Sequence, residues 1–181
     1  YEGEEIKAWC VKTVDDLKNV KTGYPADNTD NAFFLVRDLD IGDAEWNPNE
    51  LVNSMFFGNN HAIYGKIWRA GDASLFSKID GSYIRDLYLY LDVVSTAENG
   101  KVAGLTVTSY YSTIDNVQFD GSVKGYGDTA GIVVNAQNSS FYHCTVKGII
   151  ESLDDRGGGS AGGLAVGLSN NSGVDKCYVD A

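Results

Sequence analysis

Hydrophobic and polar positions follow a pattern that occurs twice in the middle of the chain. Residues 102–123 and 129–150 superpose without a gap, so that Leu105 aligns with Ile132, 27 residues later. Each segment holds a short apolar strand and, nine residues on, a second strand in which apolar and polar residues alternate. Self-similarity at a fixed spacing of about 20 to 50 residues is typical of solenoids. The pattern therefore predicts a stack of coils built from short strands.

The same pattern extends in both directions along the chain. Residues 74–93 form an earlier copy, 30 residues upstream, and residues 162–181 form a later copy after a spacing of 32 to 33 residues. The extra residues fall within 96–100 and 153–160, which are polar and rich in glycine. Such segments are typical of loops. We expect them to bulge from an otherwise regular coil.

Alternation within the second strand separates an inward from an outward face. Leu87, Leu89 and Leu91 point one way, while Tyr88 and Tyr90 point the other. Stacking the copies aligns the inward residues into three apolar columns: Leu87, Val117, Cys144 and Cys177; Leu89, Phe119, Val146 and Val179; Leu75, Leu105, Ile132 and Leu164. Neighbouring coils about 4.8 Å apart bury such columns continuously. The sequence predicts an all-β fold, a right-handed parallel β-helix (solenoid), with the hand taken from the bias of parallel crossovers.

The first part of the chain is expected to cap this solenoid. We assign residues 1–31 to an N-terminal cap and residues 32–181 to the coils. Residues 6–12 predict a strand, and Thr13 is a suitable N-cap for a short amphipathic helix with acidic residues in its first turn. Val14, Leu17 and Val20 would face inward together. This short capping helix would cover the open end of the core.

The last residues lack a comparable cap. Val179, Asp180 and Ala181 stop within an inward-facing strand, whereas the terminal repeat of a solenoid needs a polar cap for solubility. We therefore expect the coils to continue beyond the fragment, or the last coil to be covered by another chain. The sequence begins at Tyr1 rather than Met, which we interpret as a processed or excised piece of a longer protein.

Charge and composition narrow the classes of function. At 181 residues with 43% hydrophobic content, the chain is expected to form one folded domain. Its net charge of −11 argues against binding to nucleic acid or to anionic membranes, since both require clustered Lys and Arg. No apolar run approaches the roughly 18 residues of a membrane span, so no membrane insertion is predicted.

Three cysteines occur in the chain, at Cys10, Cys144 and Cys177. Without a Cys-x-x-Cys motif, a zinc or redox site lacks support. Cys144 and Cys177 share an inward column, and their distance permits a disulfide, but parallel Cβ vectors fit the bridge poorly. Buried free thiols that act as small hydrophobic residues are the preferred interpretation, with the bridge left as an alternative.

Several short motifs resemble those of a known group of proteins. The run Asp-Leu-Asp-Ile at 38–41, the Trp-x-Pro at 46–48 and the run 56–65 resemble the lead-in of bacterial surface β-helices built from GLUG motifs. The repeat itself is matched at Gly104-Leu105, Asn116-Val117, Gly121-Ser122-Val123, Gly163-Leu164 and Lys176-Cys177. The resemblance covers nearly the whole chain from Ile6 onward. The chain departs from the motif at 132–134 and at His143, where Asn is usual.

The resemblance to GLUG proteins implies a parallel β-helix within an exported and often large protein. Such proteins include adhesin-like proteins and the non-catalytic parts of some secreted proteases. The motif is specific for the fold and much less so for function, so the outward residues must be considered separately.

Parallel β-helices also host polysaccharide lyases and hydrolases, which need converging charged groups such as carboxylates about 5 to 9.5 Å apart. One outward column contains Asp120 and Lys147 side by side, and we interpret these two residues as an exposed cross-strand ion pair. The two histidines, His61 and His143, are expected several coils apart and cannot share a metal or a proton. We predict no catalytic residue, no metal ligand and no cofactor.

His143 belongs to a column of polar residues at a turn, together with Asp86, Asn116 and Lys176. Side chains at such positions are expected to hydrogen-bond to the backbone of the turn, as Asn ladders do. This interpretation gives His143 a structural role.

Tyrosine is unusually frequent in the chain, with eleven residues. Rows of exposed tyrosines beside Asp and Gln are typical of sugar-binding surfaces, which stack the ring face on a sugar and bond its hydroxyls. Tyrosine also simply suits a half-exposed strand. The candidate ligand-binding residues are Tyr88, Tyr90, Gln118, Asp120 and Tyr178.

The leading hypothesis is a non-catalytic segment of an exported bacterial protein at the extracellular cell surface. It would be an adhesin or display stalk that binds host or environmental glycan, or a host surface protein. One alternative is a carbohydrate-active enzyme or its accessory binding module, which would show converging carboxylates with a perturbed pKa. Another alternative is a structural subunit of a filament or particle.

Overall fold

The computed structural model describes residues 7–20, 31–154 and 157–181. Nearly all regular structure in these ranges is β-strand, arranged as a parallel β-solenoid of about five turns. The predicted all-β parallel β-helix is therefore confirmed. Residue 6 of the expected first strand and residues 21–30 of the expected cap lie outside the described residues. No helix of the described residues is long and apolar enough to cross a membrane.

The largest sheet has ten strands and forms one wall of the solenoid. We call it sheet A. Its strands are β1 (Lys7–Val11), β2 (Asn31–Leu35), β3 (Leu39–Glu45), β5 (Ser54–Arg69), β7 (Tyr83–Ser95), β10 (Thr113–Gly125), β13 (Ser140–Tyr142), β14 (Thr145–Ser152), β17 (Gly173–Asp175) and β18 (Tyr178–Asp180). Every pairing in this sheet is parallel.

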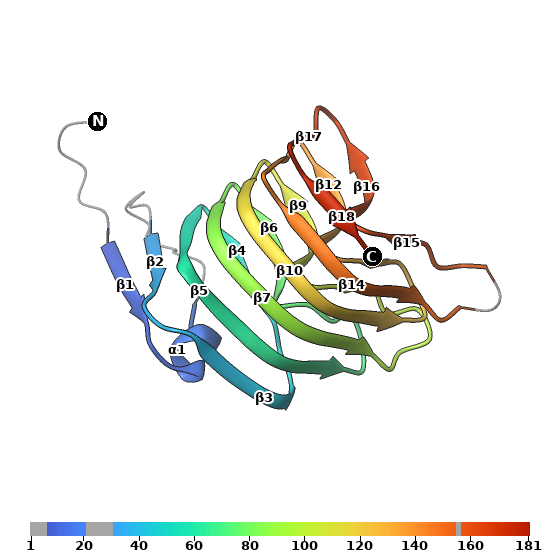
Figure 1. Ribbon diagram of the computed structural model, residues 1–181, viewed down its shortest axis with the longest axis horizontal. Coiled ribbons are helices and arrows are strands. Elements are labelled where there is room, and N and C mark those ends of the chain that lie inside the picture. The colour runs from blue at the N-terminus through green and yellow to red at the C-terminus, as the bar shows by residue number, and fades with distance from the viewer. Residues whose placement is uncertain (1–6, 21–30, 155–156) are drawn as a thin grey trace.

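Two smaller parallel sheets complete the coil. Sheet B contains β4 (Asn49–Val52), β6 (Phe76–Asp80), β9 (Thr106–Tyr110), β12 (Val133–Gln137) and β16 (Ala165–Ser169), and sheet C contains β8 (Val102–Ala103), β11 (Thr129–Ala130) and β15 (Ala161–Gly162). In Figure 1 the near strands of sheet A run downwards while the chain advances from left to right, and the return strands lie behind them. This is the right-handed sense that the crossover bias predicts.

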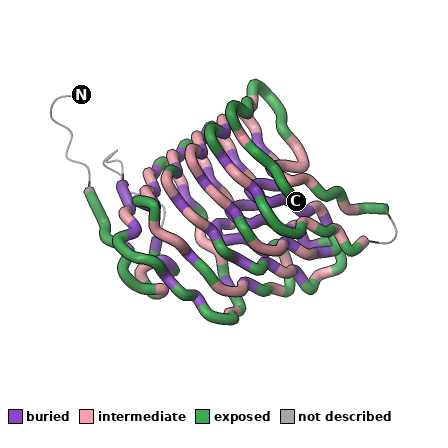
Figure 2. The backbone as a smooth tube through the Cα atoms, viewed as in Figure 1, coloured by how far each residue is buried: buried purple, intermediate pink, exposed green. Residues whose placement is uncertain are grey.

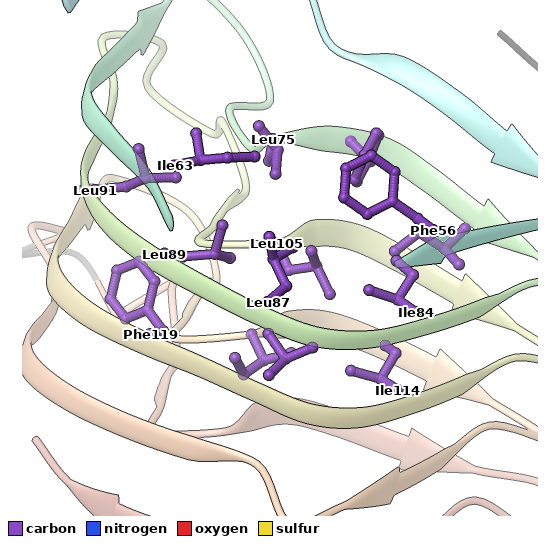
Figure 3. Close-up of a cluster of buried hydrophobic side chains, with 14 of the residues drawn as sticks. Phe56, Ile63, Leu75, Ile84, Leu87, Leu89, Leu91, Leu105, Ile114 and Phe119 are labelled. Atoms are coloured by element: carbon purple, nitrogen blue, oxygen red, sulfur yellow. The ribbon is translucent and has the colours of Figure 1, made fainter. Parts of the chain in front are cut away.

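The predicted apolar columns form the core of the solenoid. Leu89 pairs in register with Phe119, Phe119 with Val146, and Val146 with Val179. Figure 3 shows Leu87, Leu89 and Phe119 pointing into the interior, where each is at most 1% exposed. Column neighbours on successive strands bury each other, so each coil depends on the next for its apolar face.

Burial decreases in the last coil, as the green tube near the C-terminus in Figure 2 shows. Val179 is 45% exposed, whereas Val146 directly beneath it in the column is fully buried. Val174 on β17 is 46% exposed. The expectation that further coils or another chain cover this end stays a prediction.

The predicted N-terminal helix is present as α1 (Val14–Lys18). Thr13 Oγ1 accepts a hydrogen bond from Asp16 N at 3.1 Å, and Asp16 Oδ2 accepts one from Thr13 N at 2.9 Å. This reciprocal capping box satisfies backbone donors that a helix leaves unpaired at its start. Leu17 and Val20 are each 1% exposed and belong to the core, and Val14 is partly buried against it. The helix packs against β1 and β3, as expected of a cap.

Each coil turns at two corners where the backbone enters the left-handed region. The corner within or between the strands of sheet A is occupied in successive coils by Asn60, Asp86, Asn116, His143 and Lys176, with φ between +51° and +59°. This is the predicted polar column, extended by Asn60. Asn and Asp tolerate this conformation better than other non-glycine residues. The sequence thus encodes the corner even where His143 and Lys176 depart from Asn.

The bonding of this corner differs from the prediction. Asn116 Nδ2 donates to Asp86 Oδ1 at 2.8 Å, and His143 Nδ1 lies 3.0 Å from Asp115 Oδ1. These contacts join side chains of neighbouring coils, so the expected bonds to the backbone of the turn were wrong for Asn116 and His143. The reason is geometric, because stacked corners bring the side chains of successive coils within hydrogen-bond distance of each other.

Candidate ligand-binding surface

The outer face of sheet A carries the candidate residues, because alternate side chains on its strands point away from the core. Tyr88 on β7 pairs in register with Gln118 on β10, and Gln118 pairs with Thr145 on β14. Thr145 pairs in turn with Tyr178 on β18. The predicted column is therefore confirmed as a row across four strands. Tyr88 and Gln118 are neighbours, whereas Tyr178 lies two strands farther along the row.

Tyr90 has an aromatic neighbour that the repeat spacing did not reveal. It pairs in register with Tyr64 on β5, and the two residues are 52% and 42% exposed. The alternation at Ile63-Tyr64 matches that at Leu89-Tyr90 and could have revealed the pair. A register shift between Phe57 and His61 breaks the regular spacing at this coil and hid it.

We call Tyr64, Tyr88 and Tyr90 the aromatic platform. Tyr90 lies on the same strand as Tyr88, two residues on, and Tyr64 lies beside Tyr90 on the neighbouring strand. Tyr88 is half-buried and the other two are exposed. Because the three residues lie on paired strands, the backbone fixes the spacing of their Cα atoms before any ligand binds. Phenol rings in such a group present apolar faces beside hydroxyl groups.

Asp120 lies beside the platform, but not in the contact that was predicted. Asp120 and Lys147 are in register on β10 and β14. Among the ion pairs of residues 7–20, 31–154 and 157–181, none joins them within 4.0 Å, so the predicted ion pair is wrong. Register brings the two backbones together, but on an exposed face the rotamers of the two side chains decide whether their charges meet. Lys124 and Glu151, on the same two strands, do form a pair at 3.3 Å.

The histidines each pair with a carboxylate on separate coils. His61 Nδ1 lies 3.1 Å from Asp38 Oδ1, which also accepts a hydrogen bond from Ala62 N at 2.9 Å. The bond from Ala62, followed by that from His61, lowers the pKa of Asp38 below its ordinary value. His143 lies after β13, with β7 and β10 between its strand and β5. The expected separation of the two histidines is confirmed.

Asp115 links two residues of neighbouring coils. Its Oδ2 accepts a hydrogen bond from the Tyr83 hydroxyl at 3.3 Å, while Oδ1 faces His143. Burial, more than the nearby carboxylates, raises the pKa of Tyr83 above its ordinary value. These two contacts link three successive coils. We therefore assign Asp115 a structural role.

Cys144 and Cys177 are free thiols, as the preferred interpretation held, but only Cys144 is fully buried and Cys177 in the last coil is partly exposed. Cys144 N donates to Cys177 Sγ at 3.3 Å. Hydrogen bonding from Cys144 lowers the pKa of Cys177 to about 7, whereas the bond to Cys177 and burial raise the pKa of Cys144. Both residues lie on the inward column, so neither contributes to the outer face. Within the part of the chain that the structure describes, no three His, Cys, Asp or Glu residues are grouped to hold a metal.

Comparison with known proteins gives one partial similarity. The chain is 30% identical over 109 residues to the zinc metalloprotease ZmpC of Streptococcus pneumoniae serotype 4. The match covers 59% of this chain and 6% of that protein, so the chain spans only a small part of its relative. No family model matches the chain. No solved structure matches it either.

Proposed function

We propose that this solenoid is a non-catalytic, adhesin-like segment of an exported bacterial cell-surface protein, and that it binds glycan through the aromatic platform. The observation that carries the proposal is the pairing of Tyr64 with Tyr90. Both residues are about half exposed, and they lie on neighbouring strands of an otherwise well-packed sheet. Large exposed aromatic side chains that cluster on one face are typical of recognition surfaces.

The surroundings of the platform supply the polar half of sugar recognition. Gln118 lies directly beside Tyr88, and Asp120 occupies the position next to Tyr90 on β10. An amide can donate and accept hydrogen bonds, and a carboxylate accepts them from sugar hydroxyls. Rings that cover the apolar face of a sugar, with such groups at the edge, are suited to a glycan.

The strand positions hold the backbone of the platform in place. Leu87, Leu89 and Leu91 alternate with the tyrosines of β7 and are at most 1% exposed, so the backbone of this strand is anchored in the core. A preorganised surface loses less conformational entropy on binding than a loop does. A solenoid displayed outside the cell would therefore present a binding surface that loses little conformational entropy when a glycan binds.

The partial similarity supports the view of the chain as one segment of a much larger protein. The relative is named a zinc metalloprotease, and the chain matches 6% of it. Residues 7–20, 31–154 and 157–181 bring together no set of three potential zinc ligands. A binding role agrees with the non-catalytic segments that the resemblance to GLUG proteins implies.

A glycan array tests the proposal, with the wild-type chain compared with the double variant Tyr64→Ala/Tyr90→Ala. We expect the wild type to bind a defined set of glycans and the double variant to lose at least about tenfold in affinity, as for paired aromatic hot spots. Tyr126→Ala is the matched control, since Tyr126 is 43% exposed but lies outside the platform. Absence of glycan binding by the wild type, or full binding by the double variant, would overturn the proposal.

A further inference from the structure

The charged residues around the aromatic platform are mainly acidic. They lie on β3, β7 and β10, and all are exposed. We call them the acidic rim: Asp40, Asp92 and Asp120. Asp40 pairs in register with Tyr64 on one side of the platform. Asp92 follows Tyr90 on the same face of β7, and Asp120 lies beside Tyr90 on the next strand.

Few positive charges offset this rim. Lys66 points from the same face of β5, but its Nζ lies 3.1 Å from Asp43 Oδ2, so this lysine is already paired. Lys147 lies one strand beyond Asp120 and is not within ion-pair distance of it. Within the described part of the chain, no hydrogen bond or ion pair engages the carboxylate of Asp120. The platform is thus an aromatic surface within a negative field.

We propose that the aromatic platform selects a glycan that carries free amino groups, an inference that rests on the proposed glycan-binding function. The amino groups of sugars are ammonium ions in mildly acidic solution. The face of a tyrosine ring attracts a cation, and a carboxylate forms charge-assisted hydrogen bonds with it. Charge complementarity thus adds a second recognition element to the stacking of sugar rings.

The geometry fits an oligosaccharide that lies across the strands. Asp40 and Asp120 stand at opposite ends of one row, with Tyr64 and Tyr90 between them. With neighbouring strands about 4.8 Å apart, three strand spacings separate the two carboxylates by roughly 14 Å. A ligand of a few sugar units can therefore contact both tyrosines and reach a carboxylate at each end. Acidic sugars would instead meet repulsion from the rim.

Isothermal titration with two oligomers of equal length tests the inference. One is a glucosamine oligomer with free amino groups, and the other is its N-acetylated counterpart, which lacks the charges. In mildly acidic buffer, where the amino groups are protonated, we expect the glucosamine oligomer to bind at least about tenfold more tightly at low salt. The difference should shrink as added salt shortens the Debye length. Asp120→Asn should reduce this preference, whereas Tyr90→Ala should weaken binding of both oligomers.

The outcomes separate this inference from the proposed function. Equal or tighter binding of the N-acetylated oligomer would overturn the preference for amino groups and leave glycan binding intact. If no glycan binds and a lysine-rich peptide does, both proposals are overturned and the partner is a basic polypeptide. Circular dichroism of each variant ensures that lost binding reflects the altered surface.

Discussion

Ser82 N donates a hydrogen bond at 3.0 Å to the hydroxyl oxygen of Ser112, which occupies the same corner in the next coil. The relationship recurs along the solenoid in a serine ladder: Ser54, Ser82, Ser112, Ser139 and Ser172. Each of these serines directly follows a residue with positive φ, at the corner between sheets B and A. The ladder therefore supplies hydrogen bonds between coils where the strands are interrupted and backbone donors would lack partners.

Replacing Ser112 by Ala should destabilise the fold by about 1–3 kcal/mol. The change leaves the buried N–H of Ser82 without an acceptor, and this desolvation penalty is not compensated. Urea unfolding monitored by circular dichroism measures the effect. Ser77→Ala is the control, because Ser77 is half-buried on β6 and its hydroxyl has no hydrogen-bond partner among the described residues. An equal loss of unfolding free energy in both variants would contradict the role of the serine ladder.

Replacing Thr129 by Val should stabilise the protein by about 1 kcal/mol. The hydroxyl oxygen of Thr129 is fully buried and lacks a hydrogen-bond partner, and the isosteric change removes this unsatisfied polar atom. Val102 already occupies the paired position on β8. Thermal denaturation checks the gain. Thr106→Val is the comparison, because Thr106 is equally buried but its hydroxyl donates to Thr108 O at 3.0 Å. This variant should not be more stable than the wild type.

Replacing Tyr111 by Asn should also stabilise the chain, by about 1 kcal/mol. Tyr111 has φ +47° at a corner where the other coils place Asn or Gly, and its side chain is 67% exposed. The left-handed conformation costs a bulky residue more than it costs Asn. The reciprocal change, Asn138→Tyr at φ +50°, should lower the melting temperature by a similar amount. The two substitutions must change the melting temperature in opposite directions. A change in the same direction for both would refute the assignment.

The core was predictable because the repeat spacing itself fixes the register. Once Leu89, Phe119 and Val146 are aligned, the parallel pairing of their strands follows, and with it the outward row of Tyr88 and Gln118. Local propensity was not needed. The same reasoning fails where the spacing changes, and Tyr64 was missed because an irregularity in β5 precedes it.

Side-chain contacts were less predictable than strand register. Asp120 and Lys147 share a register without an ion pair, because rotamers on an open face are not determined by the backbone. The serine ladder recurs at the spacing of the coils. In a sequence, however, Ser after Asn or Gly predicts only an ordinary turn. Only the stacking of the corners shows that Ser112 accepts a bond from the previous coil.

The capping carboxylate of Asp16 should make stability depend on pH. Hydrogen bonds from the backbone, that from Lys12 foremost, lower its pKa below the ordinary value of 3.8. A carboxyl group with a lowered folded pKa stabilises the fold above its unfolded pKa, and this contribution disappears as pH falls through the folded pKa. Above about pH 4, Asp16→Asn should therefore have a lower melting temperature than the wild type. In stronger acid the two melting temperatures should become equal. Asp15→Asn removes a charge from the same turn without breaking these bonds, so it should lower the melting temperature less. If Asp16→Asn still melts at a lower temperature than the wild type at the lowest pH, the assignment is wrong.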